Sequence, residues 1–113
     1  AFKLSVASFL GGATMTKAYV IAHLTLTNPD RFMSEYMSKV GAVVEAFGGK
    51  YLVRGGEFSY QEGESLGDIT AVLEFPSRDA AHAWESSEQY QAIVKARTEN
   101  TAGPFIIIDG VPE

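Results

Sequence analysis

The sequence predicts an α+β domain in which helices cover one face of a four-stranded antiparallel sheet. Three observations carry this prediction: strand and helix patterns follow one another in the order β-α-β-β-α-β, the chain has 113 residues, and 46% of them are hydrophobic against 20% charged. This length and composition fit one folded domain with a single core. Two right-handed β-α-β units interleave into one sheet with both helices on the same side, which is the ferredoxin-like arrangement.

The domain is expected to occupy residues 15–113. Residues 1–14 show neither a helical nor a strand period, and we expect them to be an N-terminal extension or an expression remnant. A signal peptide is the alternative, because residues 4–10 are modestly apolar after Lys3. Two serines interrupt that stretch, and we therefore expect a cytoplasmic protein. No run approaches the roughly 20 apolar residues of a membrane-spanning helix.

The first strand and the first helix have clear signals. Residues 18–26 (AYVIAHLTL) are rich in β-branched and aromatic types, with one fully apolar face, and predict a strand. Asn28-Pro29 supplies an N-cap followed by proline at the first helical position. From Phe32 to Phe47, apolar residues recur at three- and four-residue steps, which predicts a buried helical stripe. Gly48-Gly49 then ends the helix.

The second half of the chain repeats these signals. We expect strands at residues 50–54, 68–75 and 105–109 and helices at residues 78–85 and 88–101. Gly55-Gly56 is expected to bend or bulge the second strand before residues 57–61 resume an extended path. Residues 62–67 (EGESLG) have the composition of a hairpin loop, and Pro76-Ser77 caps the next helix.

One face of the predicted sheet has no helix to cover it. Too many of its side chains are apolar for a surface that faces water alone. We therefore expect a homodimer in which two such faces pack together around a two-fold axis, as in a dimeric α/β barrel, and enclose a small-molecule site. By strict alternation the residues on this face are Tyr19, Ile21, His23, Thr25, Leu52, Arg54, Thr70, Val72 and Glu74.

Four strings of residues carry a family resemblance. They are residues 18–29, residues 48–57 (GGKYLVRGGE), residues 74–77 (EFPS) and residues 87–91 (SEQYQ). In this order and spacing the chain, over about residues 17–111, resembles domain-of-unknown-function family 1330. The resemblance implies a ferredoxin-like subunit of the dimeric α/β barrel superfamily, normally a homodimer, with no established activity. That superfamily also includes cofactor-independent monooxygenases, lactone isomerases and haem enzymes, and a shared fold does not choose among them.

His23 and Glu74 are the candidate catalytic residues. Both fall on the open face with Thr70, and a carboxylate beside a histidine could fix its tautomer and strengthen it as a general base. The alternative is a histidine that is simply hydrogen-bonded at a subunit contact. Glu74 could equally be an ion-pair partner of Arg54.

Arg54, Tyr19, Thr70 and Tyr36 are the candidate substrate-binding residues. The planar guanidinium of Arg54 could orient an acidic substrate, although an arginine near a bulge can also pair with Glu57 or with the backbone. Tyr36, together with Trp84 and Tyr90, could form the floor of a pocket or pack against the sheet as an ordinary core aromatic residue.

The composition argues against several classes of partner and cofactor. Nine Lys and Arg against fourteen Asp and Glu give a net charge of −5, so we expect neither nucleic acid nor an anionic membrane as a partner. With no cysteine and two histidines, we expect no metal site and no cofactor. The leading hypothesis is a homodimer that binds a small polar or anionic organic molecule. The alternatives are a cofactor-independent isomerase, lyase or monooxygenase with His23 as base, and a non-catalytic structural dimer.

Overall fold

The computed structural model describes residues 16–112, so the expected extension at residues 1–14 lies outside the described residues. The strands are β1 (Ala18–Leu26), β2 (Lys50–Arg54), β3 (Ile69–Phe75), β4 (Thr101–Ala102) and β5 (Phe105–Asp109). They form an antiparallel sheet in the order β2-β3-β1, with β5 on the other side of β1 and β4 paired with the end of β1. The ferredoxin-like fold is confirmed, with β4 as one strand more than expected.

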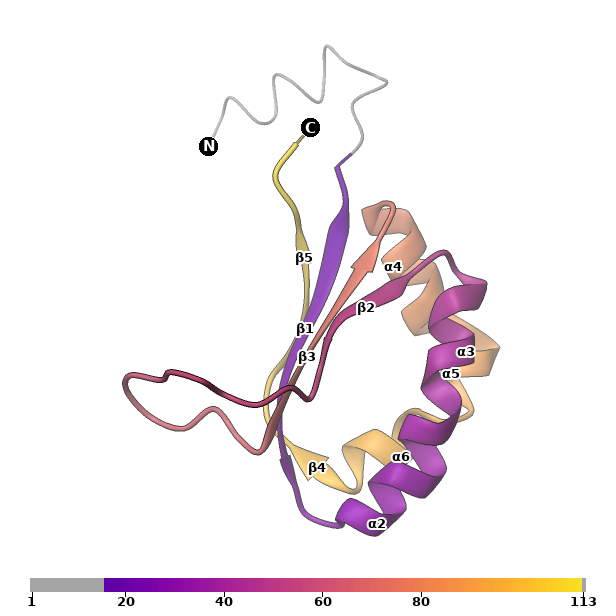
Figure 1. Ribbon diagram of the computed structural model, residues 1–113. Coiled ribbons are helices and arrows are strands. Elements are labelled where there is room, and N and C mark those ends of the chain that lie inside the picture. Colours follow the sequence, from indigo (N-terminus) through magenta and orange to yellow (C-terminus); the bar gives the residue numbers. More distant parts are fainter. Residues whose placement is uncertain (1–15, 113) are drawn as a thin grey trace.

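The helices all lie on one side of this sheet (Figure 1). They are α2 (Pro29–Phe32), the π-helical segment η1 (Met33–Met37), α3 (Ser38–Ala46), α4 (Arg78–Ser86), α5 (Glu88–Gln91) and α6 (Val94–Thr98). The first three run on continuously along the chain as the predicted first helix. Among residues 16–112, no helix is long and apolar enough to cross a membrane.

The predicted ends of the first helix are confirmed. The side chain of Asn28 accepts a hydrogen bond from the backbone N–H of Arg31 at 3.2 Å, which satisfies one of the unpaired donors of the first turn. Gly48 follows the helix with φ of +81°, a conformation that only glycine adopts readily. At Gly49 a Cβ would lie 2.5 Å from the ring of Phe75, so the absent side chain lets β2 pack closely on β3.

The predicted helix at residues 88–101 is interrupted. Ser87 caps α5 as a hydroxyl acceptor for the N–H of Tyr90 at 3.0 Å, and a break follows before α6. Asn100 ends the helical path: its side chain donates to the carbonyl of Ala96, and its own carbonyl accepts from Thr27 and Asn28. The next residues are thereby drawn to the end of β1, where they pair as β4.

The structure of the second strand corrects the predicted position of the bulge and the predicted facing of Arg54. The bulge lies at Leu52, because Tyr51 pairs with Leu73 while Val53 pairs with Val72. One extra residue reverses the facing of all that follow it, so Arg54 points toward the helices and not to the open face. Gly55 supports a turn with φ of +69°, and residues 57–61 belong to an irregular loop rather than to an extended strand.

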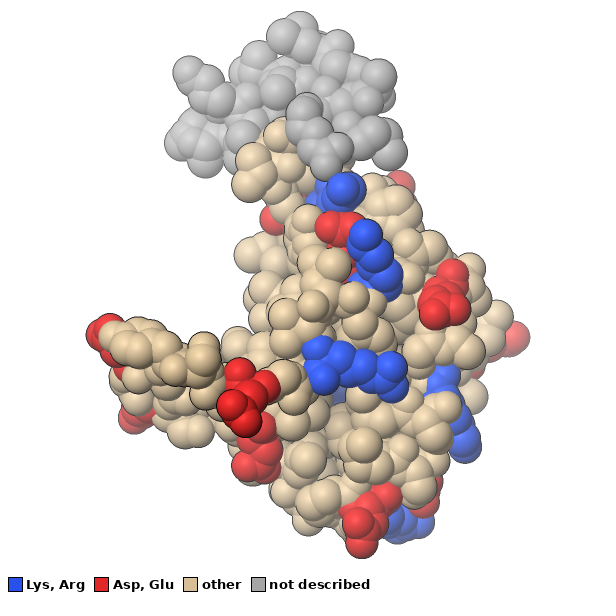
Figure 2. Space-filling view, in the orientation of Figure 1, with Lys and Arg blue, Asp and Glu red and all other residues tan. Residues whose placement is uncertain are grey.

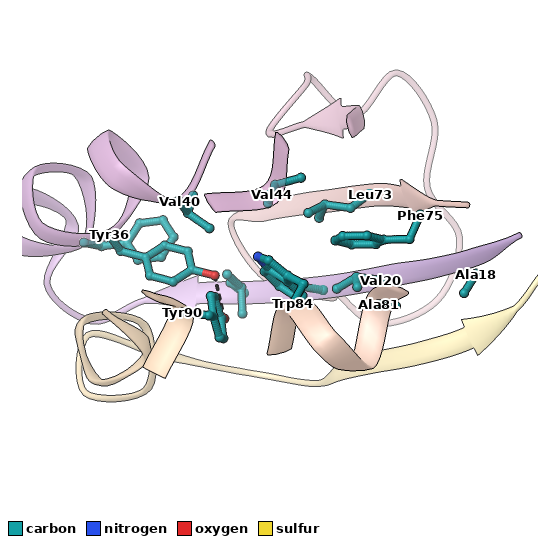
Figure 3. Packing of buried hydrophobic residues seen from close by; sticks show 13 residues of the cluster. Ala18, Val20, Tyr36, Val40, Val44, Leu73, Phe75, Ala81, Trp84 and Tyr90 are labelled. Atoms are coloured by element: carbon teal, nitrogen blue, oxygen red, sulfur yellow. Dashed lines mark hydrogen bonds between the residues drawn. The ribbon is translucent and has the colours of Figure 1, made fainter. Parts of the chain in front are cut away.

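The core fills the space between the sheet and the helices. Buried aromatic rings pack against one another along it at tilted angles, with ring centroids 5.3 Å apart for Phe75 and Trp84 and 4.2 Å apart for Trp84 and Tyr90 (Figure 3). The predicted stripe of the first helix is confirmed by the burial of Phe32, Tyr36, Val40 and Val44. The alternation predicted for β1 and β3 is confirmed by Val20, Ala22, Leu24, Leu73 and Phe75, which are all buried.

Candidate functional site

A cavity of about 270 Å³ remains between the helices and the sheet. Its floor is formed by small and aliphatic side chains of β1 and β3, among them Ala22 and Ala71. Because these two residues lie opposite each other on neighbouring strands, they leave a hollow where larger side chains would fill the space. The volume suits a small organic molecule of the kind that such partly enclosed pockets hold.

Part of the helical wall of the cavity comes from the π-helical segment. Met33, Tyr36 and Met37 of η1 all line the space. A π-helical turn is wider than an α-helical one and is frequent at functional sites. Two flexible methionines at the wall can adapt to the shape of a ligand.

Two arginines give the cavity its charge. Arg54, from the end of β2, donates from Nη2 to the carbonyl of Met37 at 3.2 Å, and its guanidinium lies 4.9 Å from the centre of the Tyr51 ring. Arg97, from α6, stacks 4.0 Å from the centre of the Phe105 ring and donates from Nε to the hydroxyl of Tyr90.

No carboxylate balances these charges. Within residues 16–112, neither arginine has a carboxylate oxygen within 4.0 Å, and the cavity lining includes no Asp or Glu. Figure 2 shows basic side chains along the seam between β2 and the helices, whereas the loop that projects from the end of β2 carries acidic ones. The cavity is therefore apolar in its walls and positive in its charge.

Two tyrosines lining the cavity stay protonated. Burial is the largest cause that raises the pKa of Tyr36, and the neighbouring Tyr90 raises it further. Burial also raises the pKa of Tyr51 to about 12, against the smaller lowering effect of Arg54. Both phenols are therefore neutral hydrogen-bonding groups at physiological pH.

The indole of Trp84 has an unused donor. The side chain is 1% exposed and lines the cavity. Its Nε1 is the buried side-chain nitrogen or oxygen for which the described part of the chain offers no hydrogen-bond partner. Leaving such a donor unpaired costs free energy, so its position calls for an explanation.

The open face of the sheet holds most of the residues that the sequence singles out. His23 Nδ1 lies 2.9 Å from Thr70 Oγ1. Tyr19 donates to Glu74 at 3.1 Å, and Lys50 Nζ lies 3.6 Å from the same carboxylate. The strand register pairs Tyr19 with Glu74 and His23 with Thr70, so Glu74 is four residues along β3 from the partner of the histidine.

The structure therefore separates the predicted catalytic and binding residues. His23, Thr70, Tyr19 and Glu74 share the open face, as expected, but His23 and Glu74 do not contact each other. Arg54 lies with Tyr36 on the opposite side of the sheet and cannot orient a substrate for His23 within one chain. A base role for His23 stays a prediction, and it requires a substrate held at the open face of the sheet.

Sequence reasoning missed part of the cavity. Arg97 falls on the same helical stripe as Tyr90 and Ile93, and a charged residue within an apolar stripe is a signal that could have marked it. The sequence marks Trp84 as a candidate for the pocket floor and the cavity lining includes it, but only the geometry shows its unpaired nitrogen. Tyr51 lies within a predicted strand and carries no special signal.

Comparisons with known proteins agree on family and fold. The family described as Domain of unknown function (DUF1330) matches residues 17–111. Among curated proteins, none matches the chain. A protein of unknown function from Rhodopseudomonas palustris has a similar structure, with a TM-score of 0.66 and 21% identity, over 96% of this chain and 92% of that one.

Two further structures are similar at lower identity. SnoaB, a cofactor-independent oxygenase from Streptomyces nogalater, has a TM-score of 0.54 and 12% identity over 82% of this chain and 91% of its own. A dimeric ferredoxin-like protein of unknown function from Thermobifida fusca has a TM-score of 0.50 and 12% identity over 85% and 91%. At such identities the likeness shows the fold alone.

Proposed function

Because this chain belongs to the DUF1330 family, whose description assigns no activity, we propose its function from the cavity: it binds a small organic anion with a largely apolar body. The observation that carries the proposal is the pairing of apolar walls with two arginines that lack a carboxylate partner within the described chain. An anionic group on the ligand would supply the missing partner, and guanidinium is the side chain best suited to bind a carboxylate.

The two arginines contribute differently to this binding. Arg54 is exposed, so it meets a ligand at the mouth of the cavity and its attraction weakens with salt. Arg97 is half-buried and fixed by its contacts with Phe105 and Tyr90, so it provides charge deeper in the protein. The apolar walls then bury the body of the ligand, which favours a hydrophobic anion over an inorganic one.

We propose that the protein forms a homodimer through the open face of the sheet. The centre of this face carries apolar side chains from four strands, because the register places Ile21, Val53, Val72 and Ile106 on it. Ile106 and Ile108 are 45% and 48% exposed. The similarity to a structure described as dimeric supports a second copy of this chain as the cover. The ligand cavity lies on the other side of the sheet, one in each subunit.

The experiment compares two ligands of one shape, 4-isopropylbenzoate and the neutral 4-isopropylbenzamide. Trp84 is the one tryptophan in the sequence and lines the cavity, so its fluorescence reports binding there. We expect the anion to bind about tenfold more tightly than the amide and Arg54→Met to remove most of that difference.

Arg31→Met is the matched control, because Arg31 is an exposed arginine that pairs with Glu35 on the helix surface. It should leave the affinity for both ligands unchanged. Equal binding of the anion and the amide would reject the proposal, and no binding of either would reject it in favour of a structural dimer.

A further inference from the structure

The hydroxyl of Tyr36 also has a hydrogen to offer. Tyr36 and Tyr90 have their hydroxyl oxygens 2.7 Å apart, and Arg97 already donates to the oxygen of Tyr90. Two phenols carry two hydrogens, but the contact between them uses only one. One hydrogen is therefore left for another acceptor.

The surroundings decide which hydrogen is left over. Tyr90 is fully buried, and no other acceptor for its hydroxyl is found among residues 16–112, whereas Tyr36 lines the cavity. If Tyr90 donates to Tyr36, the hydroxyl hydrogen of Tyr90 and the Nε hydrogen of Arg97 both have acceptors, and the hydrogen of Tyr36 is free to turn toward the cavity. The reverse direction would bury the hydrogen of Tyr90 without a partner, at a cost in free energy.

Trp84 and Tyr36 lie close to each other around Tyr90. The ring of Tyr90 is 4.2 Å from the ring of Trp84 and 6.1 Å from the ring of Tyr36, measured between centroids. Figure 3 shows the indole nitrogen at the end of Trp84 that points toward the Tyr36 and Tyr90 side chains. Two uncharged donors are thus available in one part of a cavity that is otherwise lined mainly by apolar side chains and the two arginines.

We propose that Trp84 Nε1 and the Tyr36 hydroxyl together bind an acceptor oxygen of the cavity ligand. This inference rests on the proposed function and narrows its ligand class to organic anions that carry a second oxygen acceptor, such as a carbonyl, beyond the anionic group. In a cavity with largely apolar walls, an unpaired donor discriminates against a ligand that lacks the acceptor, because the donor then stays buried without a partner.

The test uses 4-acetylbenzoate and 4-isopropylbenzoate, which share a shape and a charge and differ in one carbonyl. Calorimetry should show wild-type protein binding 4-acetylbenzoate about tenfold more tightly. Trp84→Phe, which removes the donor and keeps an aromatic ring, should abolish that preference while 4-isopropylbenzoate still binds. Tyr36→Phe should reduce it, and Tyr60→Phe in the exposed loop is the matched control that should not.

A measurement on the wild-type chain avoids any loss of folding in the variants. With one tryptophan, the ¹H–¹⁵N spectrum has one indole signal. That signal should move downfield with 4-acetylbenzoate and much less with 4-isopropylbenzoate. Equal affinities for the two benzoates with an unmoved indole signal would overturn this inference alone, whereas failure of both to bind would reject the proposed function and this inference with it.

Discussion

The two faces of the sheet differ in how their apolar side chains are covered. The helix-covered face buries Val20, Leu73 and Phe75 within one chain, so its packing is complete apart from the cavity. On the open face, polar pairs such as His23 with Thr70 stand among isoleucines and valines that one chain leaves partly exposed. The contrast underlies our two proposals, that the first face folds the chain and holds a ligand and that the second meets another subunit.

The largest expected effect comes from the helix-covered face. Phe75 is fully buried and packs on Trp84 and against Gly49, so Phe75→Ala leaves a cavity that its neighbours cannot easily fill. We expect a loss of about 3–5 kcal/mol in the free energy of unfolding, measured with urea.

Its control is Ile108→Ala on the open face. Ile108 is 48% exposed in one chain. The loss in free energy of unfolding that Ile108→Ala causes should therefore depend on protein concentration and vanish where the subunits are separated. A loss at Phe75 that also varied with concentration would contradict the division of roles between the two faces.

The second prediction concerns association. Ile106 lies opposite Ile21 at the centre of the open face, and a glutamate there would be buried without a partner in the dimer. Ile106→Glu should raise the dissociation constant of the dimer by about 100-fold or more, measured by sedimentation. Ala42→Glu on the exposed surface of α3 should not change it. Wild-type chains that remain monomeric at tens of micromolar would defeat the dimer proposal itself.

The sequence predicts which way a side chain faces only where the strand keeps a regular alternation. In β1 and β3 the alternation of apolar residues predicted the facing of each side chain, because both strands are regular along their pairing. In β2 the same reasoning placed Arg54 on the wrong face. A bulge puts two residues opposite one, and Leu52 and Val53 are both apolar, so no change of polarity marks the extra residue.

The cavity was harder to predict than the fold for a related reason. Tyr36 and Trp84 sit at positions where a helix buries its side chains, and packing alone explains both. Their second role depends on where the hydroxyl and the indole nitrogen find partners, which is a property of the assembled core. The periodicity of a sequence reports burial and carries no information on which buried donors remain unpaired.

The smallest expected effect tests the bulge that turns Arg54 inward. Deleting Leu52 removes the bulge and leaves regular alternation, with the side chain of Tyr51 facing the helices, Val53 facing the open side and Arg54 still facing the helices. The affinity for 4-isopropylbenzoate should therefore stay within about threefold of the wild-type value. Deleting Leu52 and Val53 together places Arg54 directly after Tyr51 and turns it to the open face, so this variant should bind as weakly as Arg54→Met. If the two deletions bind equally well, the facing of Arg54 does not control ligand binding, and the positive charge of the cavity has to come from Arg97 alone.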